Sequence, residues 1–217
     1  MTGVQTCALP IFDWYAPHLP RSGAVLDWGC NYAPDSCLLR ACFGDRFELH
    51  GCDFHPPGKY QVFHDFAQLD YTQLTDPLVL PYDSQQFDFV IAAGTLEHTA
   101  MDYESLKELY RVLKPGGKLV IDRLPNWLSF GEWKQRHVWK ARFHRRLYGV
   151  RDTTQLLKRT GFYPIDGGYH SLFWERRLRL FGSGPRVASW CRALTKVLPF
   201  RMRCPTLRFI AEKRKSM

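Results

Sequence analysis

The sequence predicts an α/β fold with a mainly parallel sheet, and three observations support this prediction. Strand-like and helix-like segments alternate along most of the 217 residues. The run FDFVIAAG is apolar almost throughout, which is typical of a strand that is covered on both faces. The composition, 45% hydrophobic and 24% charged, fits a globular domain with a sizeable core.

The first half of the chain supplies most of the predicted strands. AVLDWG (24–29) is a short apolar run before a turn, and PDSCLLRACF (34–43) follows as a helix because Pro34 suits a first helical turn. The next three predicted strands are FELHGCD (47–53), YQVFHDF (60–66) and FDFVIAAG (87–94).

The second half continues the alternation with longer interruptions. A helix is predicted over 102–113, where Leu106, Leu109 and Leu113 fall on one face. KPGG then predicts a helix stop and a turn. The remaining predicted elements are a strand at 118–124, a helix at 153–161, two amphipathic helices within 170–200, and strands at 162–170 and 206–214.

Charge is distributed very unevenly along the chain. Up to Trp133 there are 9 Lys and Arg against 17 Asp and Glu, whereas from Lys134 onward there are 21 against 4. Such asymmetry indicates partners and sets the electric field, but it does not decide the fold. The two basic segments, at about 125–150 and 170–204, are therefore predicted to meet the partner or the acceptor.

Targeting and metal signals are weak. MTGVQTCALPI resembles the translation of a common short-read sequencing adapter, so we exclude 1–11 from functional reasoning and expect one domain over 12–217. The seven cysteines lack C-x-x-C spacing, and we expect reduced thiols and no metal site. Reduced thiols favour a cytoplasmic protein, and no apolar run has the length of a membrane span.

The turn after the first strand, VLDWGCNYAPDS (25–36), has the position of a nucleotide-binding loop but lacks glycines. Counted from Gly29, the third position of a dinucleotide fingerprint is Pro34, which lacks an N–H and is too bulky there. Asn31 can adopt the left-handed conformation of a glycine. We expect Pro34 to hold Ala33 in an extended conformation. The loop therefore suits a cofactor without phosphates.

Five collinear motifs resemble the class I S-adenosylmethionine-dependent methyltransferases, especially the ubiquinone/menaquinone type. The resemblance runs from about Val25 to Ile121. Its motifs are VLDWGCNYA, CDFHP, HDF, LPYDSQQFDFVIAAGTLEH and LYRVLKPGGKLVI, at intervals that suit the family. It implies a Rossmann-like three-layer sandwich with a mostly parallel, seven-stranded sheet whose last strand is antiparallel.

The same resemblance implies S-adenosylmethionine as the cofactor. Asp53 is placed to bind the ribose, because one carboxylate accepts from two vicinal hydroxyls. Asp27 either holds the methionine amino group, as the resemblance implies, or orients the loop backbone. Asp65 and Phe66 are assigned to adenine by resemblance alone. The expected cofactor-binding residues are Asp27, Gly29, Cys30, Asn31, Asp53, Phe54, Asp65, Phe66, Gly94 and Thr95.

Methyl transfer requires little beyond holding the acceptor in line with the sulfonium methyl. A base is needed only where the acceptor must lose a proton, and His98 at the tip of the fourth strand is the best candidate. A role for His98 in shaping the pocket stays equally open, and Glu97 could be its partner. Asp122, Arg123 and Asn126 follow the fifth strand and are candidates to line the acceptor side.

Three kinds of acceptor suit the basic half. Basic amphipathic helices with Trp and Phe suit a lipid-like acceptor and peripheral contact with an anionic membrane. A basic surface interleaved with aromatic residues suits RNA, and a small anionic metabolite needs only one or two arginines. The resemblance favours a small or lipid-like acceptor over RNA. A cofactor-binding scaffold without catalysis is a separate alternative, since two loop glycines are replaced.

Overall fold

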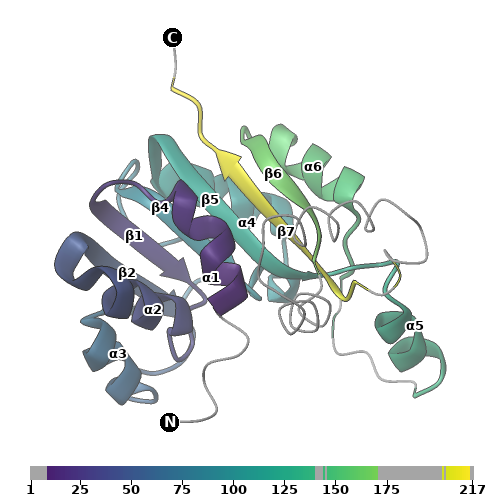
Figure 1. Ribbon diagram of the computed structural model, residues 1–217, viewed down its shortest axis with the longest axis horizontal. Coiled ribbons are helices and arrows are strands. Elements are labelled where there is room, and N and C mark those ends of the chain that lie inside the picture. The colour runs from purple at the N-terminus through teal and green to yellow at the C-terminus, as the bar shows by residue number, and fades with distance from the viewer. Residues whose placement is uncertain (1–8, 140–143, 145, 171–201, 203, 216–217) are drawn as a thin grey trace, which may run out of the picture.

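The computed structural model describes residues 9–139, 144, 146–170, 202 and 204–215. Its centre is a seven-stranded sheet with the strand order β3-β2-β1-β4-β5-β7-β6 (Figure 1). The pairs among β1 to β5 are parallel, and β7 is antiparallel to both of its neighbours. The strands are β1 (Gly23–Trp28), β2 (Phe47–Asp53), β3 (Asp70–Gln73), β4 (Phe87–Ala93), β5 (Leu113–Pro125), β6 (Tyr163–His170) and β7 (Thr206–Glu212). The predicted fold class, including the reversed last strand, is confirmed.

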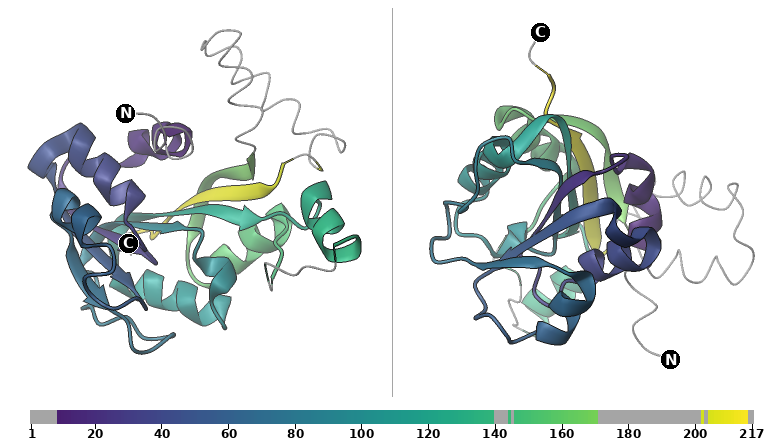
Figure 2. Two further views of the ribbon diagram at one scale, coloured as in Figure 1. Left: turned by 90° about the horizontal axis from the view of Figure 1, so that it is seen from below. Right: turned by 90° about the vertical axis from the view of Figure 1, so that its left-hand side faces the viewer.

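Helices cover both faces of this sheet. Helices α1 (Leu9–Tyr15) and α2 (Pro34–Phe43) lie on one face, and α4 (Asp102–Val112) and α6 (Val150–Arg159) lie on the other (Figure 2). Helix α3 (Gln61–Ala67) packs against α2, and α5 (Phe130–His137) follows β5. The result is a three-layer sandwich.

Each face of the sheet has its own hydrophobic core. In β1, Leu26 and Trp28 belong to the core under α4 and α6, whereas Val25, which precedes Leu26, belongs to the core under α1 and α2. In β4, Val90 and Phe89 divide in the same way. Side chains alternate because a strand has a period of two. The continuous apolar runs of these strands therefore follow from burial on both faces.

The segment 60–66 was expected to be a strand, and this expectation is wrong. Residues Gln61–Ala67 form α3, in which His64 and Ala67 are buried while Val62 and Phe66 face outward. A short run with apolar residues three and four apart fits a helix as well as a strand, so periodicity alone does not separate them. The strand of this region is β3, a polar edge strand that follows the helix.

KPGG was expected to be a turn before a strand, but it lies inside β5. Helix α4 ends at Val112 and β5 begins at Leu113, with Gly116 in a left-handed conformation at φ 84°. The Gly116 N–H donates to the carbonyl of Lys213 just beyond β7, so the segment pairs instead of turning away. The two predicted helices within 170–200 lie outside the described residues. Among the residues that are described, no helix is long and apolar enough to cross a membrane.

Candidate functional site

The site lies where the parallel strands end. Strands β1 and β4 are neighbours in the sheet, and the chain leaves them toward opposite sides of the strand order. In open α/β sheets, ligands bind beyond the carboxyl ends of the strands at such a switch point. Three loops lie at this edge of the sheet: the loop after β1, the loop after β2 and the loop after β4.

In the loop after β1, every second residue has a left-handed backbone conformation. Gly29, Asn31 and Ala33 have φ values of 71°, 50° and 51°. The prediction for Asn31 is confirmed, whereas the extended conformation expected for Ala33 is wrong. Pro34 disfavours only the right-handed helical region for the residue before it, and the turn uses the left-handed region instead. The backbone therefore has the shape of a three-glycine loop with glycine at only one of the three positions.

Gly29 is the position at which a side chain would not fit. A Cβ there would overlap the side chain of Thr95 in the loop after β4. The Thr95 hydroxyl donates a 3.0 Å hydrogen bond to the carbonyl of Trp28, so this contact joins the two loops. Thr95 thus acts on the loop through the backbone of Trp28. The side chain of Cys30, the next residue after Gly29, is buried. Burial raises the pKa of the Cys30 thiol, which disfavours a thiolate at this position.

Asp53, at the end of β2, holds the same loop from the other side. Its Oδ2 accepts a 3.0 Å hydrogen bond from the Asn31 N–H, and its Oδ1 accepts a 2.6 Å bond from the Phe54 N–H. The Asn31 carbonyl accepts a 2.8 Å bond from the ring of His64, which stacks on Tyr71. Oδ1 also accepts a 3.4 Å bond from the His55 N–H, so the free lone-pair direction is on Oδ2, which can accept from a ligand.

Four carboxyl groups are buried together beneath these loops. Asp27 accepts a 2.7 Å hydrogen bond from the Ser36 hydroxyl, and Asp35 accepts a 2.8 Å bond from the Tyr15 hydroxyl. Asp122 and Glu97 complete the group, and all four are at most 3% exposed. Asp27 therefore does not point into solvent, and its carboxyl group lies beneath the loop.

Arg123 is the cation at the centre of this acidic cluster. Its guanidinium lies 3.8 Å from Asp35 Oδ2 and 3.6 Å from Asp122 Oδ2. It reaches there because Arg123 is left-handed, at φ 63°, within an irregular part of β5. A Cβ added at Gly94 would lie 3.7 Å from both Arg123 Cδ and Glu97 Oε1, which places both groups beside the tip of β4.

The negative charges exceed what Arg123 can neutralise. Burial, followed by the charge of Asp35, raises the pKa of Asp27 to about 7, and burial raises the pKa of Glu97 to about 7. Burial also raises the pKa values of Asp35 and Asp122. The cluster thus favours an additional positive charge near it. Within the described residues, no group of His, Cys, Asp and Glu side chains has the geometry of a metal site.

Four buried side-chain oxygen atoms at this site accept no hydrogen bond from the described residues: Oδ1 of Asn31, Oε2 of Glu97 and both carboxylate oxygens of Asp122. The Asp122 oxygens form ion pairs with Arg123 and His170, which leaves Oδ1 of Asn31 and Oε2 of Glu97 as the two acceptors of interest. An unpaired buried acceptor costs free energy unless a ligand or water satisfies it. Both acceptors are therefore suited to a donor that a bound molecule would supply.

His98 lies at the mouth of the site, in the short 3-10 helix η3 (Leu96–His98). Its Nε2 is 3.9 Å from Glu97 Oε1, and its ring centroid is 6.0 Å from that of His144. The His144 Nδ1–H donates a 2.9 Å bond to Glu132 of α5. Burial, with a smaller effect of His144, lowers the pKa of His98, so the ring is neutral at neutral pH and can accept a proton.

The predicted adenine residues lie on α3, next to the loop after β1. Asp65 accepts a hydrogen bond from Gln61 of its own helix, and Phe66 is 56% exposed. Phe54 is 52% exposed beside Asp53. These exposed rings leave room for a ligand. The sequence did not single out His64, Tyr15 or Ser36, although His64 stands in the HDF motif, because their roles arise only from contacts across the fold.

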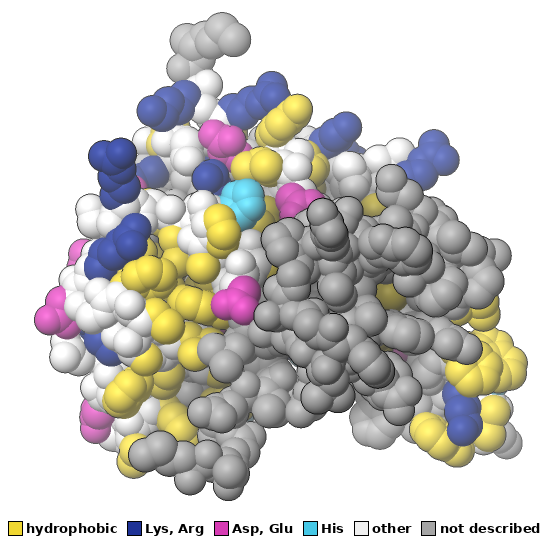
Figure 3. Space-filling model, viewed as in Figure 1, with side chains coloured by type: hydrophobic (Ala, Val, Ile, Leu, Met, Phe, Trp, Pro, Cys, Tyr) yellow, Lys and Arg dark blue, Asp and Glu magenta, His cyan; other side chains and the backbone are white. Residues whose placement is uncertain are grey.

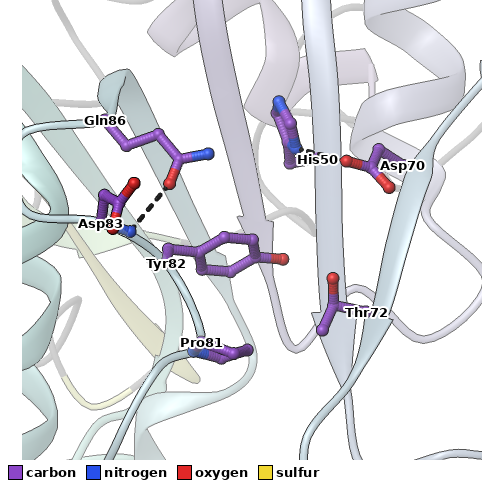
Figure 4. A pocket seen from close by; sticks show the side chains of 7 residues that line it. All are labelled: His50, Asp70, Thr72, Pro81, Tyr82, Asp83 and Gln86. Carbon is purple, nitrogen blue, oxygen red and sulfur yellow. Dashed lines mark hydrogen bonds and ion pairs between the residues drawn. The ribbon is translucent and has the colours of Figure 1, made fainter.

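A polar pocket of about 440 Å³ lies elsewhere, beside the amino end of β4 (Figure 4). It is lined in part by His50, Asp70, Tyr82 and Gln86. In Figure 4, His50 faces Asp70, and Oε1 of Gln86 accepts from the backbone N–H of Asp83. None of the predicted site residues lines it, so we place the functional site at the carboxyl ends of the strands.

Comparisons with known proteins agree with this geometry. The family described as "Methyltransferase domain" matches residues 26–121. A demethylmenaquinone methyltransferase of Staphylococcus epidermidis is 30% identical over 105 residues, which are 48% of this chain and 44% of that protein. The chain therefore spans less than half the length of this curated relative.

Two solved structures share the fold. A methyltransferase bound to the Trm112 activator of Haloferax volcanii has a TM-score of 0.67 at 17% identity, over 95% of this chain and 93% of its own. Phosphoethanolamine N-methyltransferase 2 of Haemonchus contortus, in complex with S-adenosyl-L-methionine, has a TM-score of 0.64 at 19% identity, over 95% and 52%. At these identities the similarity shows the fold alone.

Proposed function

We propose that the chain is a class I S-adenosylmethionine-dependent methyltransferase of the type-eleven kind, as the family match over residues 26–121 supports, and that it methylates a small-molecule or lipid-like acceptor. The observation that carries this proposal is the acidic cluster beneath the loop after β1. Arg123 lies among Asp27, Asp35, Glu97 and Asp122, and His170 and Arg208 act on Asp122 alone. Burial raises the pKa of all four carboxyl groups despite these cations, so a cationic ligand would be favoured beside them. The curated quinone methyltransferase relative suggests the acceptor class.

The residues present fit the cofactor. The donor carries a sulfonium and an ammonium group, which match the surplus negative charge, and it has no phosphate, which matches a loop without a phosphate grip. Oδ1 of Asn31 and Oε2 of Glu97 are buried acceptors without a described partner, as a site for N–H and O–H donors requires. Bound there, the cofactor supplies an activated methyl group.

We assign the cofactor contacts to residues on three loops. Asp53 accepts from a ribose hydroxyl through the lone-pair direction of Oδ2 that the backbone N–H groups leave free. The backbone of Gly29, Cys30 and Asn31 lies against the methionine part, with Asp27 beneath it. Gly94 and Thr95 form the wall across from that loop, while Phe54, Asp65 and Phe66 lie on the adenine side.

His98 is the residue that we propose at the acceptor. Its neutral ring can take a proton from an acceptor hydroxyl, phenol or amine as the methyl group is transferred. A pocket-shaping role predicts a different result on substitution. For a base, His98→Gln should lower kcat at every pH and remove the acidic limb of the pH profile. For a residue that shapes the pocket, it should raise KM and leave the profile unchanged.

The experiment that tests the function has two steps. Isothermal titration calorimetry with S-adenosylmethionine asks whether the folded chain binds the cofactor, and absence of binding would overturn the proposal. Radiolabelled methyl transfer to separate lipid, small-metabolite and RNA pools then asks for the acceptor. Incorporation into RNA alone would favour the RNA alternative. Binding without transfer to any pool would favour a scaffold.

Peripheral contact with an anionic membrane belongs to the same proposal. It suits a lipid-like acceptor, since such an acceptor would be reached from the bilayer surface. The basic segment at about 125–150 supports it, because part of that segment reaches the site: His144 lies beside His98, and Arg146 pairs with Asp102 at 2.9 Å. The basic segment at about 170–204 is mostly outside the described residues.

A further inference from the structure

Helix α5 turns polar side chains toward the protein and aromatic side chains outward, which is the reverse of the usual amphipathic helix. Its protein-facing side carries Glu132, which is 8% exposed, together with the half-buried Gln135 and Arg136. Its outward side carries Phe130 and Trp133, which are 53% and 51% exposed. A surface helix of a globular protein normally turns its apolar stripe inward and its charges outward. The aromatic side of α5 is therefore not explained by packing within the described chain.

The outward aromatic residues form a continuous row. Phe130, Trp133 and His137 stand three and four residues apart and stack, with centroid separations of 5.7 and 5.2 Å and interplanar angles of 17° and 22°. Trp127, Val138 and Trp139, which precede and follow α5 in the sequence, are each more than half exposed as well. Figure 3 shows yellow side chains with a blue one among them at the lower right, where Figure 1 places α5. We call this row the α5 aromatic face.

Positive charge lies beside the α5 aromatic face. The Lys134 ammonium lies 4.8 Å from the centroid of the Trp139 ring, and Arg136 lies on the protein-facing side of the helix, where it pairs with Glu132 at 4.0 Å. From Lys134 to Arg146 the sequence has six Lys and Arg and no Asp or Glu. Aromatic rings flanked by cations are typical of surfaces that bind at the interface of an anionic bilayer.

We propose that the α5 aromatic face inserts into the surface of an anionic lipid bilayer and thereby brings a lipid-like acceptor to His98. The inference deepens the proposed function and rests on it for the acceptor, although bilayer binding itself needs no turnover. Helix α5 is joined to the site through Glu132, whose carboxylate accepts from His144 beside His98. A bilayer at α5 therefore lies next to the mouth of the site.

The stacking geometry favours lipid over RNA. Recognition of single-stranded RNA requires aromatic rings with a free face on which a base can stack. In the α5 aromatic face, Trp133 is stacked between Phe130 and His137, so both of its faces are in use. Phe130 and Trp133 are nonetheless more than half exposed, which suffices for insertion among lipid headgroups.

The test compares vesicles and variants on the full chain. Wild-type protein is sedimented with vesicles of phosphatidylglycerol and phosphatidylcholine and with vesicles of phosphatidylcholine alone. The double variant Phe130→Ser/Trp133→Ser should bind the anionic vesicles at least tenfold more weakly than wild type. Tyr163→Ser, at an equally exposed aromatic on β6, should bind as wild type does. Lys134→Glu should weaken only the anionic binding.

Three results would overturn the inference. They are absence of wild-type binding to anionic vesicles, equal binding by the double variant, and equal loss in the Tyr163→Ser control. Filter binding of single-stranded RNA that depends on Phe130 and Trp133, without vesicle binding, would assign the α5 aromatic face to RNA instead. Calorimetry with S-adenosylmethionine on the double variant separates the two proposals. If the double variant retains cofactor binding but loses vesicle binding, both the proposed function and the bilayer inference are supported. If the wild-type protein binds vesicles but not the cofactor, only the proposed function is overturned.

Discussion

The hydroxyl of Tyr15 donates a 2.8 Å hydrogen bond to Asp35, and both side chains are buried. The bond joins the end of α1 to the first turn of α2, which carries Asp35 and Ser36 beneath the site. Burial, followed by the charge of Asp35, raises the pKa of Tyr15 above its usual value, so the hydroxyl stays a donor. Helix α1 thus takes part in holding the acidic cluster.

Tyr15→Phe should destabilise the fold by about 1–3 kcal/mol, because it leaves a buried carboxylate oxygen without its donor. Loss of this hydrogen bond should also raise the pKa of Asp35 further. Urea denaturation at neutral pH measures the change. Tyr163→Phe, at a half-exposed position, is the matched control and should leave the unfolding free energy unchanged. Equal stability of both variants would show that the buried bond contributes nothing.

Ala33→Gly should stabilise the chain by roughly 0.5–1 kcal/mol. The left-handed conformation costs alanine about 1–2 kcal/mol, and part of the gain is offset by the greater freedom of glycine in the unfolded chain. The control is Ala24→Gly in β1, where the same change should destabilise because the strand offers glycine no such relief. Thermal unfolding of the pair measures the contrast. Destabilisation by both would mean that Ala33 bears no strain.

Asp53→Ala should weaken binding of S-adenosylmethionine by about 2–4 kcal/mol, or roughly 30- to 1,000-fold in Kd. The loss has two parts, since Asp53 holds the loop through the Asn31 N–H and is proposed to hold the ribose. Titration calorimetry gives the Kd, and Asp83→Ala beside the amino end of β4 is the control. An unchanged Kd for Asp53→Ala would refute the assignment of the ribose site.

Asp27 should make the fold less stable as pH rises. Its folded pKa of about 7 exceeds its ordinary value near 4, so between about pH 4 and 7 the folded state keeps a proton that the unfolded state loses. Stability from this group is complete below that window and is lost through it, by up to about 1.4 kcal/mol per pH unit. Asp27→Asn should therefore gain stability relative to wild type as pH rises toward 7, and level off above about pH 8.

Glu108→Gln gives the opposite sign and serves as the control for this series. The hydrogen bond from Arg111 lowers the pKa of Glu108, so this carboxylate stabilises the fold above its ordinary pKa and not below it. The variant should be less stable than wild type at neutral pH and equal to it in acid. Urea denaturation across the pH range measures both variants, and parallel curves for Asp27→Asn and wild type would contradict the prediction.

The sequence was most informative where burial on both faces dictates the pattern. The runs in β1 and β4 are apolar apart from one aspartate each, Asp27 and Asp88, so they were predicted within a residue or two. Strand β3 is polar because it lies at the edge of the sheet, and its sequence DYTQ gave no signal. In α3, a short run fitted two periodicities, and packing against α2 decided between them.

The site was predictable by position but not in its interactions. The loop tips of β1, β2 and β4 follow from strand order, so Asp53, Gly94 and His98 could be placed from sequence. The cluster of Asp27, Asp35, Glu97 and Asp122 could not, because its members come from four elements and meet only in the folded chain. Arg123 contacts the cluster because its own backbone is left-handed, and an arginine at this position does not predict that conformation.

The position of β7 has a consequence for the order of folding. This strand pairs with β5 on one side and β6 on the other, although it follows both of them in the chain. Until residues 206–212 have been synthesised and have docked, β5 and β6 each present an unpaired edge, and such edges are prone to intermolecular pairing. Completion of the sheet is therefore a late event of translation, and the nascent chain would depend on rapid docking of β7 to escape aggregation.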